Sequence, residues 1–127
     1  MDPCDPETTV ELVSRRISAS DVEGALALYE RDAAFTAAPG EVVTGQDAIR
    51  AALERFAALE PTLTGRVRKV VQAGDVALVL NDWTLEGRQP GGEPVRMGGT
   101  SADVLRRQPD GRRLVAIDDP WGAAASG

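Results

Sequence analysis

Two aspartates in the second half of the chain, Asp103 and Asp118, stand in the middle of apolar stretches. A carboxyl group that loses its hydration in an apolar pocket has a raised pKa, and a second carboxyl group nearby raises one of the two pKa values further. One group could then act as a neutral acid and the other as a base near neutral pH. A structural interpretation stays open, in which Asp103 faces Arg106 or Arg68. In that interpretation Asp118 caps the final turn together with Asp119.

The residue types exclude several other chemistries. The chain has no histidine, which removes the commonest general base, serine–histidine triads and the usual zinc ligands. Two aspartates without histidine make a poor transition-metal site, so we expect neither a metal nor a cofactor. Cys4 is the one cysteine and cannot form an internal disulfide, which favours a reducing, cytoplasmic location.

Length and charge restrict the class of protein and of partner. A chain of 127 residues with 43% hydrophobic residues fits one domain over residues 1–127. The net charge of −6 argues against nucleic acid and against anionic membrane surfaces as partners. We find no apolar run long enough for a membrane helix and no secretory signal pattern, and we expect residues 1–5 and 123–127 to be disordered.

Two helices are expected at the start of the chain. Asp5 can cap the first, and Pro6 suits its first turn. Its apolar positions recur at helical spacing, at Val10, Val13 and Ile17. Ser20 and Glu23 form a capping-box pattern that opens a second helix. One face of this second helix would carry Val22, Leu26 and Tyr29.

A short strand and a third helix follow. The strand is expected at Ala33–Ala37, and Pro39 with Gly40 marks a turn. A second capping-box pattern, from Thr44 to Asp47, leads into the third helix. Its apolar stripe consists of Ile49, Leu53 and Phe56.

The rest of the chain has the pattern of strands joined by turns. Four strands are expected, at Leu63–Ala73, Val76–Glu86, Val95–Arg107 and Arg112–Asp118, with a bulge at Gly98-Gly99 in the third of them. Three helices followed by hairpins indicate an α+β fold with a curved, antiparallel or mixed sheet wrapped around the helices. The concave space between such layers is a natural site for a small molecule.

Three segments resemble the nuclear-transport-factor-2-like superfamily. They are Ser20–Tyr29 with Asp32-Ala33, then Gly45–Arg50, and then Asp103–Arg107 with the Pro109–Gly111 turn and Ile117–Gly122. The most similar groups are ketosteroid-isomerase-like and SnoaL-like polyketide-cyclase proteins, and the resemblance extends from Val10 to Gly122. It implies a cone-shaped domain with a deep apolar pocket for a small hydrophobic molecule, and a homodimer formed through the sheet.

Ketosteroid isomerase itself needs a carboxylate base, a tyrosine and a protonated aspartic acid. Alignment to that family places its tyrosine at Val13 and its base at Ala37, and matches only the protonated acid, at Asp103. Two of three groups are missing, so we expect no ketosteroid isomerase activity. SnoaL-like cyclases place an acid–base aspartate on the last strands, and Asp118 resembles it.

The alignment also predicts which side chains face the pocket, because side chains alternate along a strand. The inward positions of the last three strands would be Val79, Asn81, Trp83 and Leu85, then Met97, Gly99, Ser101, Asp103 and Leu105, then Leu114, Ala116 and Asp118. The pocket would further receive Val13, Tyr29, Phe35 and Phe56.

The roles expected from this arrangement are catalysis by Asp118 as base and by Asp103 as acid or oxyanion donor. The expected ligand-binding residues are Tyr29, Phe35, Phe56, Val79, Asn81, Trp83, Ser101 and Trp121. Ordinary core packing or satisfaction by neighbours is the open alternative for these residues. The function expected is a cofactor-independent isomerase, cyclase or dehydratase acting on a hydrophobic carbonyl compound. The alternative is a non-catalytic ligand-binding or dimerisation module.

Overall fold

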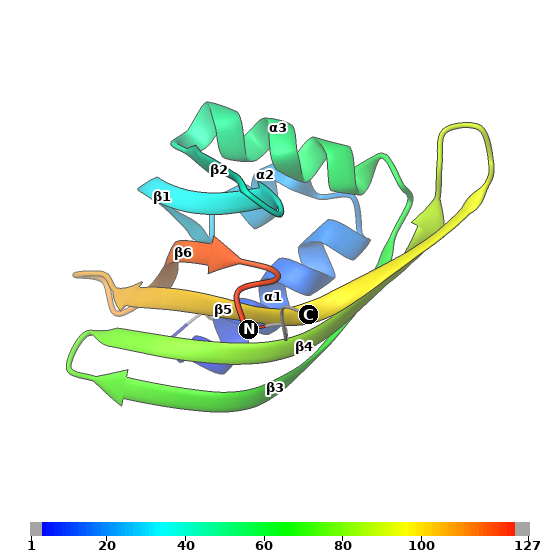
Figure 1. Cartoon of the computed structure of the whole chain (residues 1–127). Coiled ribbons are helices and arrows are strands. Elements are labelled where there is room, and N and C mark those ends of the chain that lie inside the picture. Colours follow the sequence, from blue (N-terminus) through cyan, green and yellow to red (C-terminus); the bar gives the residue numbers. More distant parts are fainter. Residues whose placement is uncertain (1–3, 124–127) are drawn as a thin grey trace.

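The chain forms two helices, two strands and a third helix in turn, and four further strands follow (Figure 1). The computed structural model describes residues 4–123. The helices are α1 (Pro6–Ser18), α2 (Val22–Leu26) and α3 (Gln46–Ala57). The strands are β1 (Tyr29–Ala38), β2 (Glu41–Thr44), β3 (Thr62–Ala73), β4 (Val76–Arg88), β5 (Pro94–Arg107) and β6 (Arg113–Asp119).

One six-stranded sheet runs in the order β2-β1-β6-β5-β4-β3. Its strand pairs are antiparallel except for β1 and β6, which are parallel, so the sheet is mixed. The sheet curves, and α1 packs against β3, β4 and β6 while α3 packs against β1 and β2 (Figure 1). The predicted α+β fold, with a curved mixed sheet around three helices, is confirmed.

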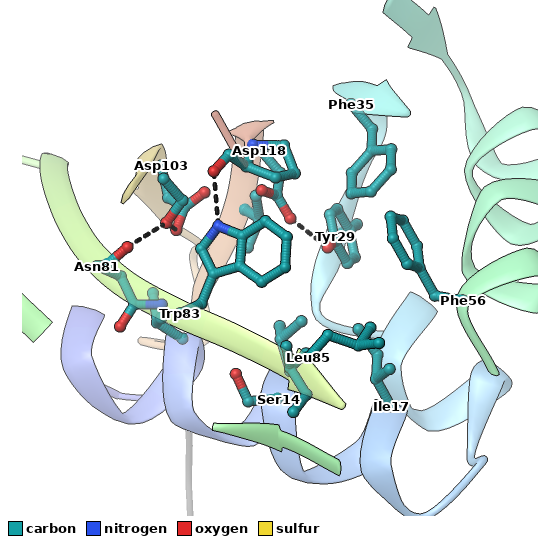
Figure 2. A pocket seen from close by; sticks show the side chains of 16 residues that line it. Ser14, Ile17, Tyr29, Phe35, Phe56, Asn81, Trp83, Leu85, Asp103 and Asp118 are labelled. Carbon is teal, nitrogen blue, oxygen red and sulfur yellow. Dashed lines mark hydrogen bonds between the residues drawn. The ribbon is translucent and has the colours of Figure 1, made fainter. Parts of the chain in front are cut away.

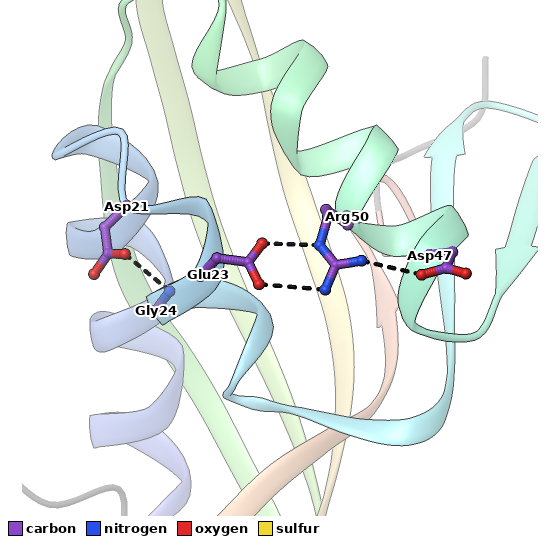
Figure 3. Close-up of polar contacts among 5 residues, drawn as sticks. All are labelled: Asp21, Glu23, Gly24, Asp47 and Arg50. Carbon is purple, nitrogen blue, oxygen red and sulfur yellow. Dashed lines mark hydrogen bonds and ion pairs between the residues drawn. The ribbon is translucent and has the colours of Figure 1, made fainter.

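The second helix is shorter than predicted. Its N-cap is Asp21, whose carboxylate accepts from the Gly24 N–H at 2.9 Å, so the predicted cap from Ser20 is wrong. Glu23 does not complete a capping box because its carboxylate forms two hydrogen bonds with the guanidinium of Arg50, which join α2 to α3 (Figure 3). The helix ends at Leu26, and Tyr29 opens β1 instead of lying on a helix face.

The third helix begins at Gln46, as its pattern indicated, but with a different cap. Gly45 is the N-cap residue and has φ of 87°, a conformation that glycine adopts without the strain other residues would incur. The expected capping box from Thr44 to Asp47 is wrong, since Thr44 ends β2 and Asp47 pairs with Arg50 at 3.0 Å. Strand β2 itself was not predicted.

The bulge lies on another strand than the one predicted. Pairing of β4 with β5 runs without interruption from Val76 to Arg88, so Gly98-Gly99 is not a bulge. Of the register shifts in the sheet, which also occur in the pairings of β1 and β3, the one that bears on the site is in β6, where Val104 pairs with Ile117 but the next residue, Leu105, pairs with Val115. The extra residue, Ala116, reverses the alternation of side chains along β6.

Both ends of the described chain are held by hydrogen bonds. Asp5, which was expected to be disordered, caps α1 by accepting from the Thr8 N–H at 2.9 Å. The Ala123 N–H donates to the Thr100 carbonyl at 3.1 Å. The remaining positions of the expected disorder, 1–3 and 124–127, lie outside the described residues. No helix within residues 4–123 is long and apolar enough to cross a membrane.

A close approach between β4 and the segment after α3 gives a prediction about stability. The Arg88 N–H donates to the Leu59 carbonyl at 2.7 Å, and a Cβ at Gly87 would overlap that same oxygen. We expect Gly87→Ala to lower the free energy of unfolding by about 1–3 kcal/mol in urea titrations, because the backbone must shift. Gly91→Ala is the matched control, since nothing lies within 4 Å of a Cβ there. Equal effects of the two substitutions would contradict the prediction.

Candidate functional site

A cavity of about 70 Å³ lies between α1 and the inner face of the sheet (Figure 2). Most of its walls are apolar or aromatic, and among residues 4–123 no lysine or arginine lines it. The lining side chains are Val10, Val13, Ser14, Ile17, Tyr29, Phe35, Phe56, Leu63, Asn81, Trp83, Leu85, Ser101, Asp103, Val115, Asp118 and Pro120. The cavity therefore resembles a pocket for an uncharged, largely apolar molecule.

Strand register brings the two aspartates together in this cavity. Asp103 on β5 pairs directly with Asp118 on β6. Tyr29, the first residue of β1, lies beside β6 and donates from its hydroxyl to Asp118 Oδ2 at 2.5 Å (Figure 2). The phenol and the two carboxyl groups come from three neighbouring strands, and Asp103 is only 5% exposed.

The Asp103 carboxyl group has one hydrogen-bond donor among the described side chains. Ser101 Oγ donates to Asp103 Oδ2 at 3.0 Å. Asp103 Oδ1 is buried and receives no N–H or O–H from the described residues. The neighbouring carboxyl group of Asp118 can hydrogen-bond to Asp103 only if one of the two groups is protonated. Asp103 Oδ1 remains without a hydrogen-bond partner among residues 4–123.

Burial has the largest effect on the titration of all three groups. It raises the pKa of Asp103 well above its ordinary value, and the charge and hydrogen bond of Asp118 raise that pKa further. Burial also raises the pKa of Asp118, although hydrogen bonds from Asp103 and Tyr29 counter part of the effect. The pKa of Tyr29 is raised by burial and by the Asp118 charge, so its phenol stays protonated. Both carboxyl pKa values therefore lie above the ordinary value, and the 2.5 Å hydrogen bond from Tyr29 favours the ionised form of Asp118.

The structural alternatives for these aspartates do not occur. Arg68 pairs with Asp82 at 3.0 Å. Arg106 lies 3.8 Å from Glu30. The terminal turn is capped by Asp119, whose carboxylate accepts from the Trp121 N–H at 3.3 Å. Within the described residues, no cation forms an ion pair with Asp103 or Asp118. Each of the two carboxyl groups accepts a hydrogen bond from a hydroxyl group, that of Ser101 or that of Tyr29.

The aromatic residues divide between the cavity wall and its surroundings. Phe35 packs edge-to-face against both Tyr29 and Phe56, with ring centroids 6.1 and 6.2 Å apart, and all three line the cavity. Trp83 lines it too, but its indole N–H donates to the Pro120 carbonyl at 2.6 Å, so only its ring face can serve a ligand. Trp121 packs edge-on against Trp83 and does not reach the cavity.

Three further residues were expected to contact a ligand. Asn81 and Ser101 line the cavity, and the side-chain amide of Asn81 makes no hydrogen bond to a described residue. That amide is free to bind a polar group. Val79 also points inward, but it belongs to the hydrophobic core and is not part of the lining. Val79 pairs with Asp103, so it lies next to the acid pair without lining the cavity.

The expected inward positions of β4 and β5 lie on the inner face, and on β6 Asp118 lines the cavity as expected. Four of the expected positions on β4 and β5 do not line the cavity, namely Val79, Met97, Gly99 and Leu105. Asn81, Trp83, Leu85, Ser101 and Asp103 are all buried on the inner face. On β6 the prediction of Leu114 and Ala116 as pocket residues is wrong, because the bulge reverses the alternation and Val115 lines the cavity instead. Sequence reasoning also missed lining residues at Ser14, Ile17, Leu63 and Pro120. The helical spacing of the apolar residues in α1 was the available signal for Ser14 and Ile17.

A metal centre has no support among the residues of the site. In the part of the chain from 4 to 123, no group of three or more histidine, cysteine, aspartate and glutamate side chains could hold a metal ion. The arrangement can hold a proton on Asp103, offer a carboxylate at Asp118 and bind a polar atom through Asn81.

The family and the fold have recognisable relatives. A family model described as a SnoaL-like domain matches residues 10–116. The structure resembles a ketosteroid isomerase-like protein from Erwinia carotovora atroseptica, at 18% identity over 89% of each chain, with a TM-score of 0.77. It also resembles a nuclear transport factor 2-like superfamily protein from Salmonella enterica, at 15% identity over 94% of this chain and 89% of that one, with a TM-score of 0.78.

A third similar structure is a candidate scytalone dehydratase from Novosphingobium aromaticivorans. The two chains are 18% identical over 89% of this chain and 78% of that one, with a TM-score of 0.79. At these identities the structural likenesses show the fold alone. No match is found among curated proteins.

The raised pKa of Asp103 predicts how stability depends on pH. The folded protein holds this proton more tightly than the unfolded chain, so stability falls as pH rises from 3.8, the ordinary value, through the raised pKa. Asparagine cannot ionise, and we expect Asp103→Asn to raise the free energy of unfolding by about 1–2 kcal/mol above pH 7. The gain should vanish below pH 4 in urea titrations.

Asp82→Asn is the control for this measurement. A hydrogen bond from Thr100 and the neighbouring Arg68 lower the pKa of Asp82, so its carboxylate stabilises the fold above the ordinary pKa. The Asp82 variant should therefore have a lower free energy of unfolding at neutral pH, whereas the Asp103 variant should have a higher one. A gain at Asp103 that is independent of pH would contradict the interpretation.

Proposed function

The chain belongs to the SnoaL-like domain family, and on this basis we propose that it catalyses proton transfer on a hydrophobic carbonyl compound without a cofactor. The reaction class is isomerisation, cyclisation or dehydration. One observation carries the proposal: two buried carboxyl groups with different proton affinities face one apolar cavity that no lysine or arginine lines within residues 4–123. Such a pair supplies an acid and a base at the same pH.

Asp118 acts as the base in this proposal. It takes a proton from the carbon beside the carbonyl group, and the electron pair of that C–H bond moves to the carbonyl oxygen. The Tyr29 hydroxyl keeps the Asp118 carboxylate ionised and oriented through its 2.5 Å hydrogen bond. The raised pKa of Tyr29 suits this role, because the phenol stays a donor throughout.

Asp103 acts as the acid. Its proton stabilises the negative charge that develops on the carbonyl oxygen, as a preorganised donor does in an oxyanion hole. Return of the proton from Asp118 to a different carbon completes an isomerisation. In a dehydration, the electron pair returns from the carbonyl oxygen to form a carbon–carbon double bond, the C–O bond of a β-hydroxyl group breaks, and this group leaves as water with the Asp103 proton. Transfer of the proton from Asp118 to Asp103 then restores both groups.

The remaining lining residues hold the substrate. The ring faces of Phe35, Phe56 and Trp83 suit a flat, apolar ring system. The free amide of Asn81 suits a second polar group of the substrate. Val13 lies at the position of the ketosteroid isomerase tyrosine and contributes an apolar side chain without a hydroxyl group. We therefore propose that ketosteroid isomerase activity itself is absent. The isomerase-like and dehydratase-like structural relatives support the reaction class by analogy of fold.

Hydrogen–deuterium exchange at carbon tests the proposal without knowledge of the true substrate. In deuterated buffer, proton NMR follows deuterium uptake beside the carbonyl of a panel of cyclic unsaturated ketones and β-hydroxy ketones. We expect the wild type to accelerate exchange for at least one member, and Asp118→Asn to lower that rate about 100-fold or more. Ligand affinity should change by less than about tenfold, or about 1.4 kcal/mol.

Asp82→Asn makes the same substitution on the outer face of β4 and should leave exchange unchanged, since Asp82 does not line the cavity. Exchange that survives in the Asp118 variant would remove this residue from the mechanism. Tight binding of panel members with no exchange above the buffer rate would favour the non-catalytic ligand-binding module.

A dimer formed through the sheet is the proposed partner arrangement. On the face of the sheet away from the helices, Val71, Leu78, Val104 and Ile117 form one row, because each is paired with the next across β3, β4, β5 and β6. Three of them are 40–49% exposed, which is unusual for neighbouring apolar side chains on one face. A second copy of the chain would cover this row.

We therefore expect a dimer mass for the wild type in size-exclusion chromatography with light scattering. Leu78→Lys should shift the protein to monomer, because an ammonium group in the row loses hydration on association. Val42→Lys, at an apolar residue of β2 that is 64% exposed and outside the row, should leave the dimer intact. A monomeric wild type would refute the proposed interface.

A further inference from the structure

We propose that Ser101 is a positioning residue of the acid pair. The hydroxyl group of Ser101 rotates, so that it donates to the Asn81 carbonyl oxygen when Asp103 is protonated and to Asp103 Oδ2 when Asp103 has lost its proton. The sequence predicted that Ser101 contacts the ligand. Here its role is instead to donate a hydrogen bond to Asp103. The inference rests on the proposed acid role of Asp103.

The geometry around Ser101 offers two acceptors for one proton. Ser101 Oγ lies 3.0 Å from Asp103 Oδ2 and 3.3 Å from the Asn81 carbonyl oxygen. Ser101 is paired with Asn81 across β4 and β5, and it stands two residues before Asp103 on the same face. A hydroxyl group has a single proton to donate, so it can serve only one of the two acceptors at a time.

The protonation state of Asp103 decides between these acceptors. A buried carboxylate is costly unless donors surround it, so the ionised form draws the Ser101 proton to Oδ2. A neutral carboxyl group is a weaker acceptor, and the proton can then turn back to the Asn81 carbonyl. Rotation of one hydroxyl group thus provides a hydrogen bond for Asp103 at the moment when it has lost its proton.

Unlike the Ser101 hydroxyl group, the other polar groups near Asp103 do not favour its ionised form. Asp118 and Asp119 on β6 carry negative charge and raise its pKa. The Tyr29 hydroxyl of β1 is directed at Asp118 and not at Asp103. From α1 the cavity receives Ser14 and apolar side chains only. Ser101 is therefore the neighbour, among the described residues, whose hydrogen bond favours the ionised form of Asp103.

Carbon-13 NMR of the aspartate carboxyl groups in the ligand-free protein tests this assignment. We expect Ser101→Ala to move the titration of Asp103 to higher pH, because the ionised form loses its donor. Ser101→Thr keeps a hydroxyl group at the same place and should return the titration toward that of the wild type. Ser14→Ala is the matched control: it removes a serine hydroxyl from the same cavity, but one that donates to neither aspartate.

Three results would overturn the inference. The Asp103 titration could remain unmoved in Ser101→Ala. It could move equally in the alanine and threonine variants, which would indicate altered packing. It could move equally in Ser14→Ala, which would indicate a general effect on the cavity. The measurement needs no substrate, so a protein that titrates as expected but exchanges no deuterium would refute the proposed function and leave the Ser101 assignment standing.

Discussion

Two carboxyl groups buried side by side with no cation next to them cannot both ionise, and the arrangement of this protein follows from that constraint. Asp103 and Asp118 meet across β5 and β6, inside an apolar cavity. Tyr29 donates to one of them and Ser101 to the other. The shorter bond, from Tyr29, favours charge on Asp118. The site thus obtains an acid and a base from two identical side chains.

The distribution of charge over the sheet keeps this pair unneutralised. The two arginines that the sequence offered as partners of Asp103, Arg68 and Arg106, are paired with Asp82 and Glu30 instead. An arginine turned inward would lower both carboxyl pKa values and remove the difference in proton affinity. Exposed ion pairs contribute little to stability, and these two direct Arg68 and Arg106 at surface carboxylates.

The two faces of the sheet have separate tasks in this architecture. The inner face carries the cavity, and the C-terminal turn completes it, since Pro120 lines the cavity and accepts from the Trp83 indole. Glycine at 99 permits this, because a Cβ there would come within 3.1 Å of the Trp121 ring. The outer face carries a row of apolar side chains that suits a second copy. Association would therefore leave the proposed chemistry undisturbed.

The sequence by itself determined the order of most elements, the α+β class and the inward face of β4 and β5, because helical spacing and strand alternation are local patterns. Asp103 and Asp118 were identifiable as carboxyl groups in apolar surroundings for the same reason. Only the tertiary structure decided that Tyr29 leaves the helix and reaches Asp118, 89 residues away in the chain. It also decided that a bulge at Ala116 turns Val115 inward. Both depend on strand pairing between distant segments, where one extra residue reverses every side chain beyond it.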